Sequence, residues 1–233
     1  MNDLKICILT IATNKYIQFV QNLYDTIDEN FLNGNHIEGL LITNHEVDSS
    51  ENIKVSTIDH EPWPMPTLKR YNYFMKEYDY ISKFDYCFYF DVDMKVVSQI
   101  KEDEVVGDLV AVQHPYKINE TPEQFSYERR SKSTAHISHQ EGKHYYAGGF
   151  NGGSTKEFLK MSEKIANNVI ADLNNGIVAV WHDESHMNRY LIDNPPSLSL
   201  TPSYCYAEEF WGTDYPYEPK IVALKKNHNE LRS

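Results

Sequence analysis

Two aspartates, Asp91 and Asp93, follow a fully apolar run at Tyr86–Phe90, with one residue between them. In an open α/β sheet, ligands bind outside the carboxyl ends of the strands, so carboxylates at this point would face a ligand. Two carboxylates can hold a hard divalent cation, which can bridge a diphosphate and neutralise the charge of a leaving group. A pair this short also occurs by chance and usually marks a turn. The apolar run favours the metal site, because buried strand ends seldom present two acids without a reason.

A second dense group of chemical side chains lies at residues 180–186, which include Trp181, Asp183 and Glu184. Acids are favoured in the first turn of a helix by its dipole and by capping, which explains them without any function. A Trp ring beside carboxylates also suits a sugar, because the ring stacks on the apolar face of the sugar while the carboxylates accept hydrogen bonds from its hydroxyls. We interpret this segment as a functional site.

Residues 147–153 hold four glycines in seven residues. Glycine weakens the interior of a strand and often marks a bulge or the close approach of a ligand. The residues alone leave both interpretations open.

The elements that must position these groups follow from hydrophobic periodicity. Short apolar runs predict strands, and apolar residues at helical spacing predict helices. Strands are expected at residues 4–13, 37–43, 53–58, 86–90, 109–113 and 145–153, and helices at 15–31, 67–83, 155–173 and 183–192. Thr67 and Thr155 are the expected N-caps. The early order of strand, helix and strand predicts a parallel sheet with right-handed crossovers. Residues 115–144 predict a long loop, which is usually functional inside a compact domain.

The composition is that of an ordinary globular protein, with 41% hydrophobic and 24% charged residues among 233. A formal net charge of −12 argues against nucleic acid as the main partner, since phosphate binding needs a basic face. No stretch approaches the roughly 20 apolar residues of a membrane span, and the polar start predicts no signal peptide. The three widely spaced cysteines indicate a reducing compartment. We therefore expect a cytoplasmic protein of one domain.

Taken together, these segments resemble glycosyltransferase family six, the family of the ABO blood-group transferases and the α1,3-galactosyltransferases. The matching pieces occur in the order of the family and cover nearly the whole chain. They are residues 11–17, Trp63 with Arg70, residues 90–94, His114-Pro115, residues 125–130, residues 145–153, Asn175-Gly176, residues 180–188 and residues 226–232.

The resemblance implies a GT-A fold, in which a Rossmann-like nucleotide lobe at about residues 1–113 merges with an acceptor lobe at about 114–219. A basic tail at 220–233 would close over a diphosphate. Glu184 would be the catalytic residue, and His114 and Trp181 would join it in binding the acceptor. Asp91 and Asp93 would bind the metal. The donor site would comprise Ile11, Ala12, Thr13, Tyr16, Arg70, Asp91, Val92, Asp93, Ala147, Gly148, Gly149, Asp183, Lys226 and Arg232.

The activity implied by the resemblance is a retaining α1,3-transfer of N-acetylgalactosamine (GalNAc) or galactose from a UDP-sugar to a glycan ending in galactose. Gly149 stands where the family tunes the donor, and its lack of a side chain leaves room for an N-acetyl group, which favours UDP-GalNAc. Manganese is the expected cofactor. Many bacterial relatives replace both aspartates with asparagines and work without metal, whereas this chain keeps Asp91 and Asp93.

The resemblance also brings a difference and two rival classes. Animal members carry an amino-terminal membrane anchor, and we expect none here, as in a bacterial or viral member. A metal-dependent hydrolase of sugar nucleotides would share the aspartate pair, but it would not need Trp181. A non-catalytic sugar-binding module would not need Glu184 or the basic tail.

Overall fold

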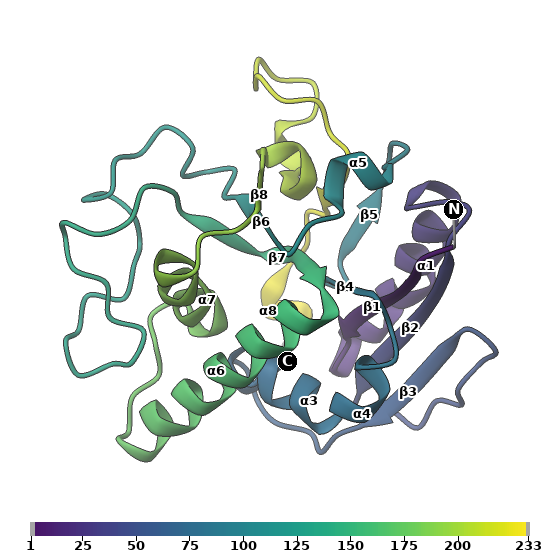
Figure 1. Ribbon diagram of the computed structural model, residues 1–233, viewed down its shortest axis with the longest axis horizontal. Coiled ribbons are helices and arrows are strands. Elements are labelled where there is room, and N and C mark those ends of the chain that lie inside the picture. The colour runs from purple at the N-terminus through teal and green to yellow at the C-terminus, as the bar shows by residue number, and fades with distance from the viewer. Residues whose placement is uncertain (1–2, 232–233) are drawn as a thin grey trace.

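A central sheet of seven strands organises the computed structural model, which describes residues 3–231 (Figure 1). The strand order is β3-β2-β1-β4-β7-β6-β8. The strands are β1 (Lys5–Ile11), β2 (His36–Thr43), β3 (Ile53–Thr57), β4 (Tyr86–Phe90), β6 (Leu109–Gln113), β7 (Tyr146–Ser154) and β8 (Leu198–Leu200). The predicted parallel pairing is confirmed for β1 to β4, whereas β7 runs antiparallel to both of its neighbours. This arrangement confirms the α/β class.

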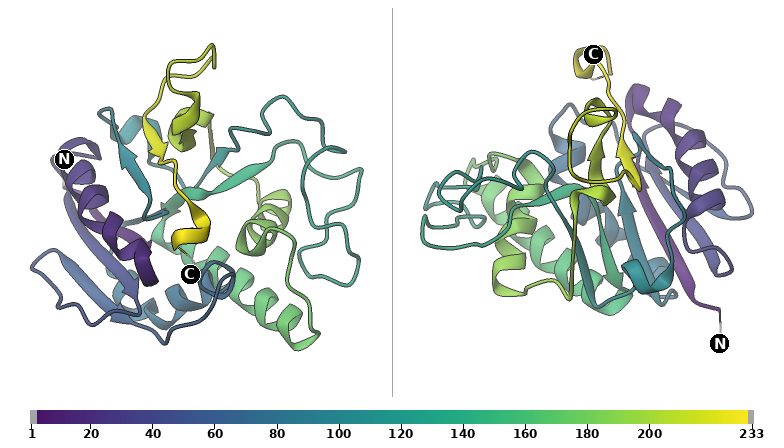
Figure 2. Two further views of the ribbon diagram at one scale, coloured as in Figure 1. Left: turned by 180° about the vertical axis from the view of Figure 1, so that it is seen from behind. Right: turned by 90° about the horizontal axis from the view of Figure 1, so that it is seen from above.

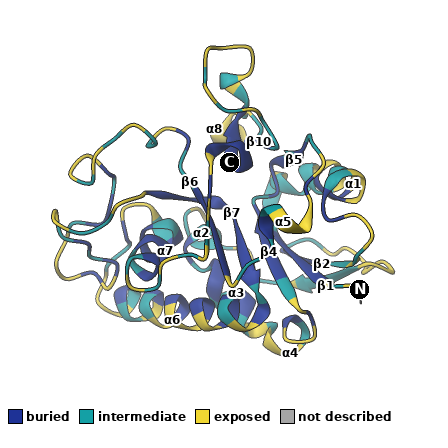
Figure 3. Ribbon diagram, turned by 45° about the horizontal axis from the view of Figure 1, so that its top comes forward, coloured by how far each residue is buried: buried dark blue, intermediate teal, exposed yellow. Residues whose placement is uncertain are grey.

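Helices cover both faces of the sheet, because the apolar side chains of β1 point alternately to the two sides. Cys7 and Leu9 pack in one core with α3 (Arg70–Lys76) and α6 (Thr155–Asn174). Ile6 and Ile8 pack in the other core with α1 (Val20–Asn30). Figure 3 shows the buried strands between helices whose outer faces are exposed.

The helices depart from prediction mainly at their ends. The helix expected at 67–83 is three short helices, α2 (Met65–Leu68), α3 and α4 (Tyr78–Ile81), separated at Lys69 and Glu77. The N-cap of α2 is Pro64, so the prediction of Thr67 as the N-cap was wrong. A proline within the first turn explains the earlier start, because the first amides of a helix need no intrahelical acceptor.

Two other helices also begin differently from the prediction. The helix expected at 15–31 begins as a 3-10 helix, η1 (Asn14–Phe19), and becomes α1 only at Val20. Thr155 is the first residue of α6, so the N-cap position belongs to Ser154. The prediction for Thr155 was therefore wrong by one residue.

A second, smaller sheet carries the elements that flank the site. It joins β5 (Met94–Val96), which directly follows Asp93, to β10 (Ile221–Ala223) and β9 (Tyr206–Ala207). The sequence reading missed these strands, which are only two or three residues long. From β10 the chain continues to α8 (His228–Leu231), the yellow segment that overlies the centre in the left view of Figure 2 and stands at the top edge in the right view.

The predicted long loop is confirmed, because residues 115–144 form no helix or strand. Phe125, Tyr127 and Ile137 pack with Tyr145 in a small core of their own, which anchors this loop beside β7. The remaining elements are α5 (Glu102–Val105), α7 (His182–Asp193), η2 (Pro202–Cys205) and η3 (Glu208–Phe210). Between residues 3 and 231, no helix has the length and apolar character needed to cross a bilayer. The division into a nucleotide lobe and an acceptor lobe stays a prediction.

Candidate active site

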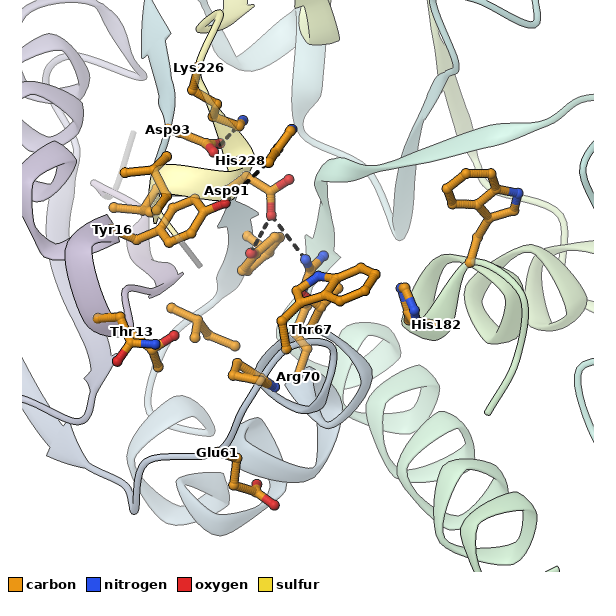
Figure 4. Close-up of a pocket in the computed structure, with 18 residues that line it drawn as sticks. Thr13, Tyr16, Glu61, Thr67, Arg70, Asp91, Asp93, His182, Lys226 and His228 are labelled. Atoms are coloured by element: carbon orange, nitrogen blue, oxygen red, sulfur yellow. Dashed lines mark hydrogen bonds and ion pairs between the residues drawn. The ribbon is translucent and has the colours of Figure 1, made fainter. Parts of the chain in front are cut away.

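A pocket of about 260 Å³ opens at the carboxyl ends of β1 and β4 (Figure 4). This is the edge of the sheet at which an α/β protein of this kind binds its ligands. Many of the residues predicted from sequence line it, namely Ile11, Thr13, Tyr16, Arg70, Asp91, Val92, Asp93, Trp181 and Lys226. The site therefore draws on segments from both ends of the described chain.

One end of the pocket is built by the turn after β1. Tyr16 lies on η1, and its hydroxyl is 3.3 Å from Nδ1 of His228 on α8. Ile11 and Thr13 line the same end, whereas Ala12 is completely buried against Leu41 and Val92. The tail thus packs against Tyr16, one of the residues predicted for the donor site.

The aspartate pair lies at the centre of the pocket, where each carboxylate already has a cationic neighbour. Asp91 Oδ1 accepts hydrogen bonds from Tyr89 Oη at 2.6 Å and from Arg70 Nη2 at 2.9 Å. Asp93 Oδ2 forms an ion pair with Lys226. Burial raises the pKa of Asp93, against the effect of Lys226.

The donor set fits a hard divalent cation in a shared site. Across residues 3–231, no group of three or more His, Cys, Asp or Glu side chains is arranged to hold a metal ion. Two carboxylates at one strand end supply oxygen ligands for part of a coordination shell, and phosphate oxygens and water would complete it. Such a cation would bind together with a diphosphate, with Asp91 and Asp93 as its protein ligands.

Arg70 links the aspartates to the other acids of the site. Its Nη1 donates to the carbonyl of Gly148 at 2.7 Å and lies 2.9 Å from Asp183 Oδ2. Its guanidinium stacks over the ring of Tyr89 at 3.9 Å. Burial alone would lower the pKa of Arg70, but Asp183 and Asp91 raise it, so the guanidinium stays charged although it is only 4% exposed.

The glycine-rich strand contains a bulge at the site. Ala111 pairs with Asn151 and Val112 pairs with Ala147, so residues 148–150 are extra on β7. A Cβ on Gly148 would lie 3.5–3.6 Å from Arg70, Glu184 and Asp183. The bulge interpretation is confirmed. It directs the backbone of Gly148 toward the acids, and ligand approach at this point stays a prediction.

The second glycine pair of the strand has a packing explanation. A Cβ on Gly152 would lie 2.4 Å from the carbonyl oxygen of Cys87. Gly153 has a φ of +140° and lies against Asp108, so it too excludes a side chain.

Glu184 is held by two hydrogen bonds from groups on and beside β7. Its Oε1 accepts from Tyr145 Oη, and its Oε2 accepts from the Gly148 amide, both at 2.7 Å. Burial, with a further contribution from Asp91, raises the pKa of Glu184 to about 7 despite these donors. Burial likewise raises the pKa of Asp183 to about 7, although Arg70 lowers it. Two adjacent acids thus titrate near neutrality, as acids in catalytic sites often do.

Of the two further residues predicted to bind the acceptor, Trp181 lines the pocket and His114 does not. Trp181 precedes α7 and is 50% exposed at the pocket. His114 stands behind Tyr145, with the two ring centroids 5.6 Å apart. Burial lowers the pKa of His114 to about 4, so its ring is neutral. His114 therefore reaches Glu184 through Tyr145, outside the pocket that Trp181 lines.

Several side chains of the site were not assigned a role from sequence, and four of them stand out by their contacts. They are Tyr89, Tyr145, His182 and His228. Tyr89 could have been found by alternation, since it lies on β4 two residues before Asp91, and side chains two apart in an extended chain project to the same side. His182 meets Trp63 edge to face at 4.9 Å, and no periodicity predicts that contact. Arg232, the second cation predicted for the diphosphate, lies outside the described residues.

Comparisons with known proteins give a consistent result. The sequence pattern of the family described as Glycosyltransferase family 6 matches residues 1–233. The histo-blood group ABO system transferase 1 of Rattus norvegicus is 30% identical over 244 residues, covering 100% of this chain and 70% of that protein. The globoside alpha-1,3-N-acetylgalactosaminyltransferase 1 of Homo sapiens is 31% identical over 236 residues, covering 96% and 65%. The O-antigen biosynthesis glycosyltransferase WbnI of Escherichia coli is 29% identical over 207 residues, covering 87% and 88%.

Proposed function

Because the chain belongs to glycosyltransferase family 6, we propose that it transfers GalNAc from UDP-GalNAc to a galactose-terminated glycan, with retention of the α configuration. The family makes it a glycosyltransferase that uses a sugar-nucleotide donor and a glycan acceptor. The large parallel-rich sheet is consistent with the expected GT-A fold. The donor, the linkage, the stereochemistry and the metal are parts of the proposal.

One observation carries the proposal, namely the position of Arg70 between two pairs of acids. On one side it bonds Asp91 of the aspartate pair at 2.9 Å. On the other side it lies 2.9 Å from Asp183, next to Glu184. A diphosphate bound at the aspartates would therefore place the attached sugar beside Asp183 and Glu184. The Arg70 guanidinium would then lie near the bond that joins the sugar to the diphosphate.

Departure of UDP defines what the pocket must do. The bond between C1 of the sugar and the β-phosphate oxygen breaks, and its electron pair leaves with UDP. Lys226, with Arg70 beside the aspartates, would stabilise the negative charge that grows on the phosphate, which is usually the largest catalytic effect. A divalent cation, when bound, would supply further electrostatic stabilisation of the same leaving group.

The other half of the reaction concerns the sugar. Glu184 would meet the positive charge that develops at C1, either as a covalent nucleophile or as an orienting group during same-face substitution. Asp183 would accept hydrogen bonds from hydroxyls of the donor sugar. The acceptor hydroxyl then bonds to C1, which breaks the bond to Glu184 if a covalent intermediate has formed, and passes its proton to a phosphate oxygen of the bound UDP. Trp181 would stack on the acceptor ring, and His114 would support the acceptor site through Tyr145.

The preference for GalNAc rests on Gly149 and on the relatives. An ideal Cβ at this position would lie 3.2 Å from Asp91 Oδ2 and 3.4 Å from Cys205 Sγ, so any side chain would take up room beside the aspartate. The human relative is named for GalNAc transfer with an α1,3 linkage.

The test is release of UDP from UDP-GalNAc and from UDP-galactose, with manganese or with EDTA, against a panel of galactosides. We expect manganese-dependent release that a galactoside stimulates, with UDP-GalNAc preferred. Glu184→Gln should lower turnover by orders of magnitude and leave UDP affinity nearly unchanged. Activity that EDTA does not affect would exclude Asp91 and Asp93 as a metal site.

Two rival functions give different results in the same assay. Release of free sugar that no acceptor stimulates would favour a sugar-nucleotide hydrolase. Binding of a glycan without binding of UDP would favour a non-catalytic sugar-binding module.

A further inference from the structure

A buried carboxylate in the long loop contacts the segment that leads into α7. Glu128 lies within residues 125–130, is 1% exposed and binds Arg130 through three donors. Its Oε2 also accepts a hydrogen bond at 2.9 Å from the amide of Val180, 52 residues away. The proposed function assigns no role to the ion pair of Glu128 and Arg130.

Arg130 strengthens the link from the other side. Its Nη2 donates to Glu128 at 2.5 Å and to the carbonyl of Val178 at 2.6 Å. The pair therefore holds both the carbonyl of residue 178 and the amide of residue 180. Burial by itself would raise the pKa of Glu128, but the donors from Arg130 and Val180 outweigh it and hold the pKa at about 2. The carboxylate is consequently ionised at every working pH.

Residues 178–181, which we call the α7 turn, depend on outside partners. The next residue, His182, has a φ of +52°, which is uncommon for a residue other than glycine. Two hydrogen bonds join the α7 turn to the start of α7. The His182 amide donates to the carbonyl of Ala179 at 3.0 Å, and the Trp181 amide donates to Ser185 Oγ at 2.9 Å. The Val180 amide points instead to Glu128. Strained backbone of this kind persists where its surroundings fix it.

The turn affects Trp181 and Glu184 unequally. The Glu184 amide donates to the Trp181 carbonyl at 3.0 Å, but its carboxylate, inside α7, has separate hydrogen bonds from Tyr145 and Gly148. Trp181 lies before the helix, and half of its surface is exposed. A loosened turn would therefore displace the indole while the carboxylate stays in place.

We propose that Glu128, supported by Arg130, is a positioning residue for the acceptor, because it fixes the α7 turn so that the Trp181 indole meets the acceptor sugar. The inference rests on the proposed transferase function. It assigns Glu128 no contact with either substrate.

The test compares Glu128→Gln with Glu141→Gln. Glu141 lies in the same loop, but it bonds Ser138 at 2.8 Å and Arg189 at 3.0 Å, outside the turn. Loss of one charged hydrogen-bond partner predicts a roughly tenfold higher acceptor KM in Glu128→Gln. The rate of donor hydrolysis by water and the affinity for UDP should both stay within about twofold of wild type. The reason is that groups other than Glu128 hold Glu184 and the end of the pocket that would bind the nucleotide. Glu141→Gln should match wild type in all three.

Hydrogen exchange tests the structural half without any activity. Peptides covering residues 177–184 should exchange faster in Glu128→Gln than in Glu141→Gln. Arg130→Gln is a second variant for the case in which Glu128→Gln does not fold, since the Arg130 side chain is more than half exposed. It should show the same two effects with smaller amplitude.

Two results would overturn the proposal. One is an equal acceptor KM in Glu128→Gln and Glu141→Gln, and the other is an equal loss of transfer and hydrolysis. If wild-type protein released no UDP from either donor, the proposed function would fail first. Equal exchange of residues 177–184 in the two variants would then refute the role of Glu128 in fixing the turn as well.

Discussion

The hydroxyl of Tyr145 donates a hydrogen bond to Glu184 Oε1 at 2.7 Å, while the Gly148 amide holds Oε2 at the same distance. Both carboxylate oxygens are thus oriented by groups of the protein itself. Fixed donors of this kind avoid reorganisation during the reaction. Tyr145 in turn packs against Phe125 and Tyr127, so the long loop supports the orientation of the acid.

Tyr145→Phe should lower turnover roughly 10- to 100-fold, because it removes one hydrogen bond to a charged group. The bond from Tyr145 lowers the pKa of Glu184, so its loss should also move the acidic limb of the pH profile to higher pH. UDP affinity should not change. Steady-state kinetics from pH 5.5 to 9, with calorimetry for UDP, checks each part.

Tyr146→Phe is the matched control for that variant. Its hydroxyl is 3.2 Å from Ser199 Oγ, away from Glu184. Equal kinetics for the two variants would show that the Tyr145 hydroxyl has no specific effect on the acid.

The acid pair also predicts how activity depends on pH. The pKa values of Asp183 and Glu184 are each raised to about 7, first by burial. If Glu184 must be ionised, kcat/KM rises with pH through about 7 and is roughly tenfold lower one unit below that value. A profile that is flat from pH 5.5 to 8 would contradict an essential ionised Glu184.

Stability should change with pH in the opposite direction. A carboxyl whose folded pKa exceeds its unfolded value binds its proton more tightly in the folded state, so its contribution falls as pH rises from about 4.5 to 7. Glu184→Gln cannot lose a proton. Relative to wild type it should gain on the order of 1–3 kcal/mol between pH 4 and pH 8. Urea unfolding of both proteins without ligands at the two pH values measures the difference, and a constant difference would exclude the raised pKa.

Much of the fold and site could be predicted from sequence because strong local patterns carried them. The apolar run at β4 located Asp91 and Asp93, and the parallel order of β1 to β4 followed from strand and helix alternation. The segment at 180–186 and the glycine bulge were recognised by residue type. These features depend on neighbours in the chain, which a sequence displays directly.

Other features depend on contacts between distant segments and left no periodic signal. The bond from Glu128 to Val180 spans 52 residues, and the Tyr16 hydroxyl meets His228 across 212 residues. The strands β5, β9 and β10 are too short for alternation to predict, since their pairing comes from tertiary contacts. The early start of α2 at Met65, before the expected N-cap Thr67, is explained by a proline that fits the first turn of the helix.

Gly149→Ala should change donor preference. Its Cβ would lie 3.2 Å from Asp91 Oδ2, 3.4 Å from Cys205 Sγ and 3.5 Å from Met94 Sδ, which removes space proposed for the N-acetyl group. We expect the ratio of kcat/KM for UDP-GalNAc to that for UDP-galactose to fall roughly 10- to 100-fold. Competition between the two donors in one reaction gives this ratio directly.

Gly148→Ala is the comparison for Gly149→Ala, because its Cβ would face Arg70, Asp183 and Glu184 at 3.5–3.6 Å. It should lower the use of both donors and leave their ratio nearly unchanged. An unchanged ratio in Gly149→Ala would refute the steric argument for GalNAc.

Lys226 and a divalent cation should compete for Asp93, because the Lys226 ammonium pairs with Oδ2 of Asp93. Lys226→Ala should therefore bind manganese several-fold more tightly when no nucleotide is present, since the site loses a competing positive charge. With manganese saturating, the same variant should bind UDP roughly tenfold more weakly, because a charge-assisted contact to the diphosphate is lost.

Lys225→Ala makes the same change in net charge at an exposed neighbour and should alter neither affinity. Calorimetric titrations of manganese and then of UDP measure both effects. Opposite signs for the two ligands are expected only if Lys226 exchanges Asp93 for phosphate, so weaker binding of both would mean that Lys226 does not compete with the metal.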